Sequence, residues 1–127
     1  MLNNIAGLLR RLGLDRTLLV SAAPYRRAAH ARGEGCQIDL LVQTRRTVWV
    51  VEIKRCREIG REVIDEVAEK VKRLGVGRRV SVRTALVYSG HLSPAVEAEG
   101  FFDAVVDAAD IMSDRIPASE CGIIAAN

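Results

Sequence analysis

The sequence predicts a single α/β domain with a mixed central sheet flanked by helices. Apolar and β-branched runs alternate with helical segments along the chain, which is the pattern of such a domain. The length of 127 residues is enough to bury one core without structural staples. Hydrophobic residues make up 49% of the chain and charged residues 28%, which excludes a disordered or fibrous protein. We expect one domain over residues 1–112 and a flexible C-terminal tail over residues 113–127, where periodicity is lost.

The first elements are a short helix and a strand. Apolar residues recur at helical spacing before Gly13 and predict an amphipathic opening helix. Residues 17–23 predict a strand that ends at Pro24, because proline cannot donate a ladder hydrogen bond. The basic residues 25–35 then form a loop or a frayed continuation of the strand.

A hairpin and a long helix follow. Residues 36–42 and 47–53 are rich in β-branched and apolar side chains and are joined by a polar connector, so they predict two antiparallel strands. Residues 61–74 carry an apolar stripe at helical spacing and favourable i,i+4 charge pairs. Gly75 is placed to end this helix.

The remaining elements complete the order α-β-β-β-α-β-(α)-β. Residues 81–88 predict a strand, and Ser93 followed by Pro94 predicts the N-cap and first residue of a short helix. Residues 101–106 predict a last strand and residues 107–112 a final helical turn. We therefore expect one layer of sheet with helices packed on it.

Charge and cysteine content bound the environment and partners. The formal net charge of +3 is compatible with a polyanionic partner, and arginines gather between residues 10 and 32. The three cysteines show no metal-binding spacing, so we interpret them as reduced thiols of a cytoplasmic protein. No run approaches the roughly 18 to 20 apolar residues of a membrane span, so no membrane partner is expected.

Three charged residues interrupt the apolar runs of the predicted hairpin: Asp39 in the first, and Glu52 and Lys54 in the second. Because strand side chains alternate between faces, Glu52 and Lys54 point the same way. An even loop at the hairpin tip pairs positions whose numbers sum to 91, which places Asp39 opposite Glu52. Carboxylates facing each other across two strands, with Cβ atoms about 4.5 to 5.5 Å apart, repel unless a cation lies between them.

This group predicts a site for Mg²⁺ or Mn²⁺. Mg²⁺ takes one or two carboxylates and keeps waters for the phosphate oxygens of a substrate, and the main-chain carbonyl of Ile53 is a further predicted ligand. Asp39, Glu52 and Lys54 are then catalytic residues of phosphodiester hydrolysis, with Lys54 orienting or helping to deprotonate the attacking water. The alternative interpretation is a half-solvated hairpin with a surface ion pair worth about 0 to 1 kcal/mol. The residues alone leave both open.

Asp39 and the E-x-K tripeptide at residues 52–54 resemble the motif of the PD-(D/E)XK nuclease superfamily. The resemblance implies the restriction-endonuclease-like fold, an α-β-β-β-α-β core with the metal site on its second and third strands. Residues 35–75 are similar to a nuclease-type domain at the C-terminus of certain prokaryotic AAA-type ATPases, which implies an ATPase domain in a longer parent protein. No carboxylate precedes Asp15, although many members of the superfamily contribute an acidic ligand from the first helix.

The resemblance implies a magnesium-dependent nuclease domain that hydrolyses phosphodiester bonds in DNA. A catalytically inactive nuclease-fold domain for nucleic-acid binding or regulation is the alternative, because the acidic residue of the first helix is missing. A third hypothesis is a module in which the apolar strands form a homodimer. Glu62 on the following helix is a further candidate ligand, although its position on the solvent-exposed face of that helix is the simpler explanation for an acidic residue there. The residues predicted to contact nucleic acid are Gln37, Arg26, Arg27 and Arg32.

Overall fold

The computed structural model describes residues 5–14, 19–29, 35–111 and 119–120. The elements follow one another as α1 (Ile5–Arg11), β1 (Leu19–Arg27), β2 (Cys36–Thr44), β3 (Thr47–Ile59), α2 (Glu62–Leu74), β4 (Ser81–Leu92), α3 (Pro94–Glu99) and β5 (Ala104–Asp107), with a 3₁₀ turn over Ala108–Asp110 and a short β6 (Ser119–Glu120). The predicted tail over residues 113–127 lies outside the described residues, apart from β6. Each predicted strand of the domain is present, and β3 and β4 run farther than expected.

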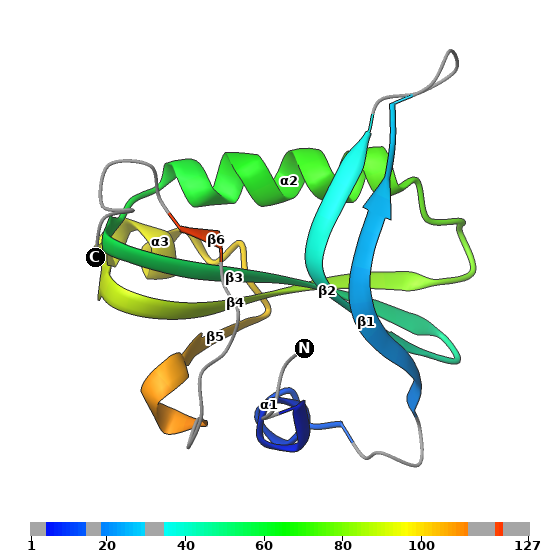
Figure 1. Ribbon diagram of the computed structural model, residues 1–127, viewed down its shortest axis with the longest axis horizontal. Helices are drawn as coiled ribbons and strands as arrows, with labels where there is room; N and C mark the ends of the chain where they lie inside the picture. The colour runs from blue at the N-terminus through cyan, green and yellow to red at the C-terminus, as the bar shows by residue number, and fades with distance from the viewer. Residues whose placement is uncertain (1–4, 15–18, 30–34, 112–118, 121–127) are drawn as a thin grey trace.

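The strands form one mixed sheet in the order β1-β2-β3-β4-β5, with β6 beside β3 (Figure 1). The pairs β1–β2 and β2–β3 are antiparallel, whereas β3–β4 and β4–β5 are parallel. The parallel pair β3–β4 is joined by α2, as a crossover connection requires. The predicted α/β class with a mixed central sheet is therefore confirmed.

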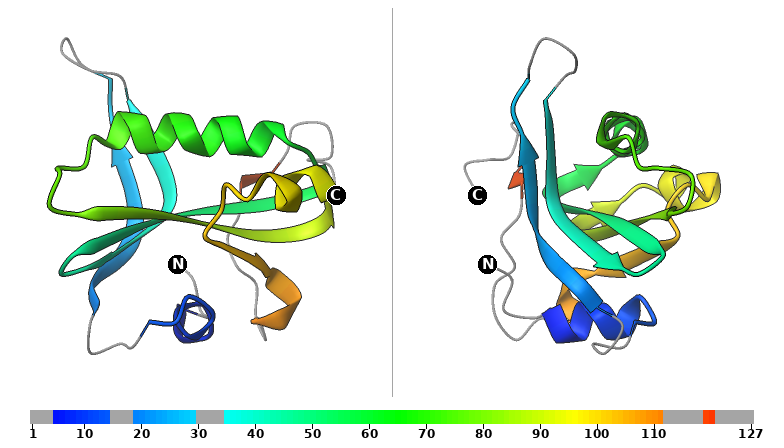
Figure 2. Two further views of the ribbon diagram at one scale, coloured as in Figure 1. Left: turned by 180° about the vertical axis from the view of Figure 1, so that it is seen from behind. Right: turned by 90° about the vertical axis from the view of Figure 1, so that its right-hand side faces the viewer.

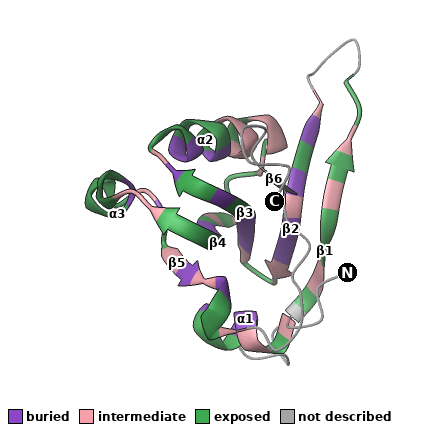
Figure 3. Ribbon diagram, turned by 60° about the vertical axis from the view of Figure 1, so that its left-hand side comes forward, coloured by how far each residue is buried: buried purple, intermediate pink, exposed green. Residues whose placement is uncertain are grey.

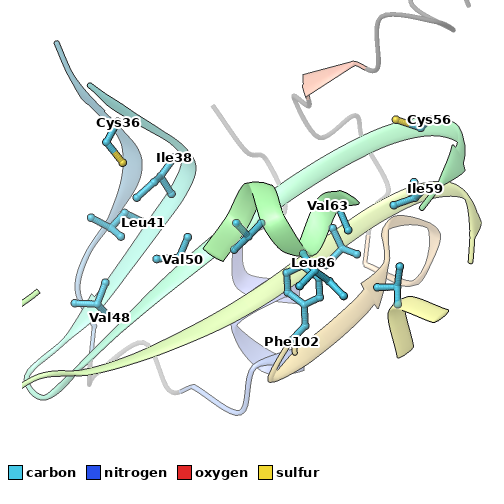
Figure 4. Close-up of a cluster of buried hydrophobic side chains, with 13 residues drawn as sticks. Cys36, Ile38, Leu41, Val48, Val50, Cys56, Ile59, Val63, Leu86 and Phe102 are labelled. Atoms are coloured by element: carbon cyan, nitrogen blue, oxygen red, sulfur yellow. The ribbon is translucent and has the colours of Figure 1, made fainter. Parts of the chain in front are cut away.

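Helices cover both faces of the sheet, and each face has its own apolar core. Figure 2 shows α1 on one side of the strands and α2 with α3 on the other. Val50 and Leu86 belong to the cluster on the α2 side, shown in Figure 4, whereas Val51 and Val87 belong to the cluster that contains Leu8 and Leu9 of α1. The alternation along β3 and β4 thus fills both cores, as expected for central strands buried on both faces. Trp49 packs in the α1-side core.

The middle helix behaves as its sequence predicts. Val63, Ile64 and Val67 of α2 are buried against the sheet. The helix ends at Gly75, which adopts a left-handed conformation with φ of 64°. Within the described residues, none of the helices combines the length and the apolar character that crossing a lipid bilayer requires.

Strand β1 does not end at Pro24 but continues for three residues beyond it. It is the edge strand of the sheet, and Figure 3 shows it more exposed than β2. At the proline the register shifts: the two steps from Ala23 to Tyr25 match three steps in β2, from Leu41 to Ile38. The predicted strand end was wrong because an edge strand with a β-bulge opposite it accommodates a residue that lacks an N–H group.

The cysteines are not all reduced. Cys36 is a free, buried thiol, whereas Cys56 is disulfide-bonded. Both side chains belong to the core on the α2 side (Figure 4). The expectation of three reduced thiols is therefore wrong for Cys56.

Candidate functional site

The two strands of the hairpin separate at Asp39. The predicted register is confirmed up to that point, since the four pairs of the ladder all have numbers that sum to 91: Leu40–Val51, Leu41–Val50, Val42–Trp49 and Gln43–Val48. The ladder ends at Leu40, so the predicted direct pairing of Asp39 with Glu52 is not formed. Farther along, β3 pairs with β6 from Lys54 onward. Figure 1 shows β2 turning away together with β1 while β3 continues beside β4. We call this divergence of β2 from β3 the fork.

Asp39 bridges the fork. Its Oδ2 atom accepts a hydrogen bond of 2.9 Å from the backbone N–H of Ile53. Asp39 lies in the bulged segment of β2 between Ile38 and Leu41. The side chains of Ile38 and Leu41 both belong to the core on the α2 side. Bulges interrupt strict alternation and change the direction of side chains. The carboxylate of Asp39 thus takes the place of a ladder bond and is held beside the residue that follows Glu52.

Glu52 is a buried acid beneath α2. Its side chain is 1% exposed, and its Oε1 atom accepts a hydrogen bond of 2.8 Å from Nζ of Lys70. Its Oε2 atom lies 3.5 Å from Nζ of Lys54. Burial raises the pKa of Glu52 above its ordinary value, and the negative charge of Asp39 adds to the rise, whereas Lys70 and Lys54 oppose it. The fold therefore places two acids close enough for one to disfavour ionisation of the other.

Lys54 lies between two carboxylates at the fork. Its ammonium is 3.5 Å from Glu52 and 3.3 Å from Oε2 of Glu66, which projects from α2. The side chain of Lys54 is 11% exposed, whereas that of Glu66 is 48% exposed. These contacts hold the Lys54 ammonium at the site and leave its surroundings open to water on the Glu66 side. The structure thus brings the three predicted catalytic residues together.

Sequence reasoning missed Lys70, and it interpreted Glu66 as part of the solvent-exposed face of the helix rather than as part of a site. Their i,i+4 spacing on α2 suggested a solvated pair, but Lys70 instead contacts Glu52 and Glu66 contacts Lys54. The signal for Lys70 was its position three residues after the buried Val67, which places it beside the apolar stripe that faces the sheet. Glu62, the helix acid considered as a ligand, is exposed at the first residue of α2.

The residues predicted to contact nucleic acid gather at one cleft beside the fork. A cleft of about 580 Å³ lies between the ends of β1 and β2 and the helix α2, and Arg26, Arg27, Gln37 and Lys70 line it. Arg27 donates a hydrogen bond to the carbonyl oxygen of Arg73 near the C-terminal end of α2, so this arginine ties the strands to the helix. Arg32 lies outside the described residues. Three of the four predicted contacts therefore share a cleft with the partner of Glu52.

The two carboxylates at the fork can hold a hydrated divalent ion, provided that one lysine moves away. Asp39 and Glu52 supply two carboxylates, and among the described residues there is no group of three or more His, Cys, Asp or Glu side chains that could hold a metal. Mg²⁺ is commonly held by one or two carboxylates and several waters, so two are sufficient. The condition is that one ammonium leaves Glu52, since both of its oxygens face a lysine. The carbonyl of Ile53 stays a predicted ligand.

The raised pKa of Glu52 predicts a pH-dependent stability. The ordinary pKa of a glutamate carboxyl is 4.5. Between this value and the raised pKa of the folded state, Glu52 keeps its proton in the folded chain but loses it in the unfolded chain. The stability that this carboxyl contributes is therefore complete below pH 4.5 and is lost as the pH rises through the folded-state pKa. Glu52→Gln cannot ionise, so we expect its free energy of unfolding to fall less than that of the wild type between pH 4.5 and neutrality.

Urea unfolding at a series of pH values measures this difference. Glu58→Gln, at an exposed position of the same strand, is the control and should follow the wild type. Parallel pH profiles for Glu52→Gln and the wild type would contradict the assignment of a raised pKa to Glu52.

Comparison with known proteins gives no relative from which a role can be transferred. Neither a protein-family model, nor a curated protein, nor a solved structure matches this chain.

Proposed function

We propose that this chain is a metal-dependent nuclease domain that hydrolyses phosphodiester bonds in DNA. The observation that carries the proposal is the fork, where the carboxylate of Asp39 bonds the amide next to the buried Glu52 and the ammonium of Lys54 lies 3.5 Å from Glu52. This is the juxtaposition that the resemblance to the PD-(D/E)XK superfamily implies. The observed order α1-β1-β2-β3-α2-β4 is compatible with the α-β-β-β-α-β core of that superfamily.

The electrostatics of the fork support a cationic ligand. Glu52 is withdrawn from water and lies in the field of Asp39, which is an arrangement that usually costs stability. Perturbed carboxyls that share a site with a second acid are enriched at functional sites. A divalent ion that binds both carboxylates removes their repulsion, which gives the placement of the buried Glu52 near the half-buried Asp39 a physical reason.

Each residue of the fork has a defined role in this proposal. Asp39 and Glu52, with the carbonyl of Ile53, hold Mg²⁺ or Mn²⁺, which when bound neutralises a phosphate and lowers the pKa of a coordinated water. Lys54, held in place by Glu52 and Glu66, donates hydrogen bonds to the attacking water or to a phosphate oxygen and stabilises the charge that develops there. Arg26 and Gln37 line the adjoining cleft, where they can contact the phosphate backbone of a bound DNA strand.

Incubation of the chain with labelled oligonucleotides tests the proposal. We expect Mn²⁺ or Mg²⁺ to support cleavage of single- or double-stranded DNA and EDTA to abolish it, with matched RNA substrates measured alongside. Isothermal titration with Mn²⁺ in the absence of nucleic acid measures metal uptake separately from cleavage. Metal uptake without cleavage of any of these substrates would contradict the nuclease proposal.

A second candidate function is nucleic-acid binding without cleavage. The observation that favours it is that Lys54 and Lys70 already compensate part of the charge of Glu52 in the absence of a metal. DNA binding that weakens with salt, together with no uptake of Mn²⁺ and no cleavage, would support this function over the first. A homodimer and an ATPase domain in a longer parent protein stay predictions of the sequence.

A further inference from the structure

We propose that Lys70 is a built-in counter-ion of Glu52, which a divalent metal must displace, so that Lys70 sets the metal affinity of the fork. The inference rests on the proposed function, since it concerns the same pair of carboxylates. It assigns a role in metal binding to a residue that lies outside the Asp and E-x-K motif and belongs to a different element, α2.

Glu52 forms ion pairs with Lys70 and Lys54, and the contact with Lys70 is the shorter one. Nζ of Lys70 lies 2.8 Å from Oε1 of Glu52, whereas Nζ of Lys54 lies 3.5 Å from Oε2. Since the side chain of Glu52 is 1% exposed, water cannot solvate its charge. An ionised carboxylate in such a place requires a partner, and a charge-assisted hydrogen bond is the strong form of that pairing.

Lys70 and a metal ion compete for the same oxygens. Mg²⁺ binds carboxylate oxygens at about 2.0 to 2.1 Å, so an ion on Glu52 would lie within roughly 5 Å of the Lys70 ammonium in its observed position. Like charges at that separation repel strongly when water is excluded from around them. Binding of the ion and retention of the Lys70 contact are therefore antagonistic.

Lys70 can turn into the adjoining cleft when it is displaced, whereas Lys54 is paired with a second carboxylate. The side chain of Lys70 is 24% exposed and lines the cleft that also contains Arg26 and Gln37. Its flexible aliphatic chain lets the ammonium turn from Glu52 into this cleft, where it would pair with a phosphate of a bound DNA strand. Lys54 is 11% exposed and is also held by Glu66, so it stays at the fork. One lysine thus serves as the exchangeable counter-ion and the other as the fixed one.

Isothermal titration of Mn²⁺ into Lys70→Met tests the inference without an activity measurement. We expect this variant to bind Mn²⁺ about tenfold more tightly than the wild type, because the metal no longer has to break a charge-assisted hydrogen bond. Lys72→Met removes the same charge from an exposed position of the same helix and should bind like the wild type. Lys70→Arg keeps the cation and should also bind like the wild type, and Asp39→Asn added to Lys70→Met should remove the tight binding.

The outcomes separate the two proposals. Equal affinities for the wild type and Lys70→Met overturn the role of Lys70 and leave the nuclease proposal standing. No uptake by either protein overturns both. Should Lys70→Met not fold without metal, circular dichroism during a Mn²⁺ titration replaces calorimetry, and metal-induced folding supports the inference. In that case Lys70→Gln, which retains a neutral hydrogen-bond donor, is titrated beside Lys70→Met. The inference is overturned if Lys70→Gln binds Mn²⁺ with wild-type affinity and Lys70→Met shows no metal-induced folding.

Discussion

Asp39→Asn is expected to reduce the rate of DNA cleavage by about 100-fold or more while leaving the protein folded. The amide oxygen of Asn can still accept the hydrogen bond from the N–H of Ile53, so the fork keeps its shape. The negative charge that binds the metal is lost, and charge stabilisation by a bound metal is worth several kcal/mol in the transition state. Single-turnover cleavage of a labelled duplex in Mg²⁺ measures the rate, and thermal unfolding checks the fold.

Two further variants sharpen this prediction. Lys54→Met is expected to lower the rate by a similar factor, because it removes the donor at the fork and leaves both carboxylates. Asp65→Asn makes the same chemical change as Asp39→Asn at an exposed position of α2 and should cleave like the wild type. Wild-type cleavage by Asp39→Asn, or an equal loss of cleavage in Asp65→Asn, would contradict the assignment of Asp39 as a catalytic residue.

Gly90→Ala is expected to destabilise the protein by about 3 kcal/mol or more. Gly90 lies in β4 with φ of 124°, a conformation that residues with a side chain rarely adopt. A Cβ atom there would lie 1.6 Å from the carbonyl oxygen of Cys56 in β3. The overlap is with backbone, so the register shift of β3 between Arg55 and Glu58 would have to rearrange as well.

Urea unfolding of Gly90→Ala beside Gly77→Ala measures this effect. Gly77 precedes β4, and a Cβ added there meets no atom within 4 Å, so this control should change the free energy of unfolding by only about 0.5 kcal/mol. A Gly90→Ala protein within about 1 kcal/mol of the wild type would show that the pairing of β3 with β4 differs from the one described. Since that pairing positions Glu52, the result bears on the site as well as on the fold.

The hairpin and its register could be predicted because local signals agreed. The strands flank a short polar connector, and an even loop fixes the pairs from the hairpin tip to Leu40–Val51, so counting brought Asp39 to the end of the ladder, next to the E-x-K segment. The middle helix and its end at Gly75 were predictable for the same reason, since the stripe and the stop signal agree.

The bulge could not be predicted from local propensity. Pro24 indicates a strand end when it is considered alone, and only the neighbouring strand reveals that β2 supplies one extra residue opposite it. The consequence reaches the site, because the extra residue lies in the segment that contains Asp39. Counting alternate faces across this segment is therefore unreliable for Gln37, which lines the adjoining cleft.

The role of Lys70 depends on tertiary packing. Its spacing from Glu66 on α2 is equally compatible with a solvated pair, which is the commoner arrangement on a helix. Only the packing of α2 over β3 brings Lys70 to Glu52, 18 residues away in the sequence. A site assembled from two strands could be predicted from the hairpin, whereas its counter-ion comes from a helix whose rotation about its axis is set by the core.

A crystal structure of the protein soaked with Mn²⁺, with anomalous scattering recorded, tests most directly whether the fork is a metal site. We expect an anomalous peak within about 2.0 to 2.3 Å of one carboxylate oxygen from Asp39 and one from Glu52, with Lys70 turned away from Glu52. No peak at the fork at saturating Mn²⁺, with the ammonium of Lys70 still bonded to Glu52, would contradict the metal site and with it the proposed hydrolysis.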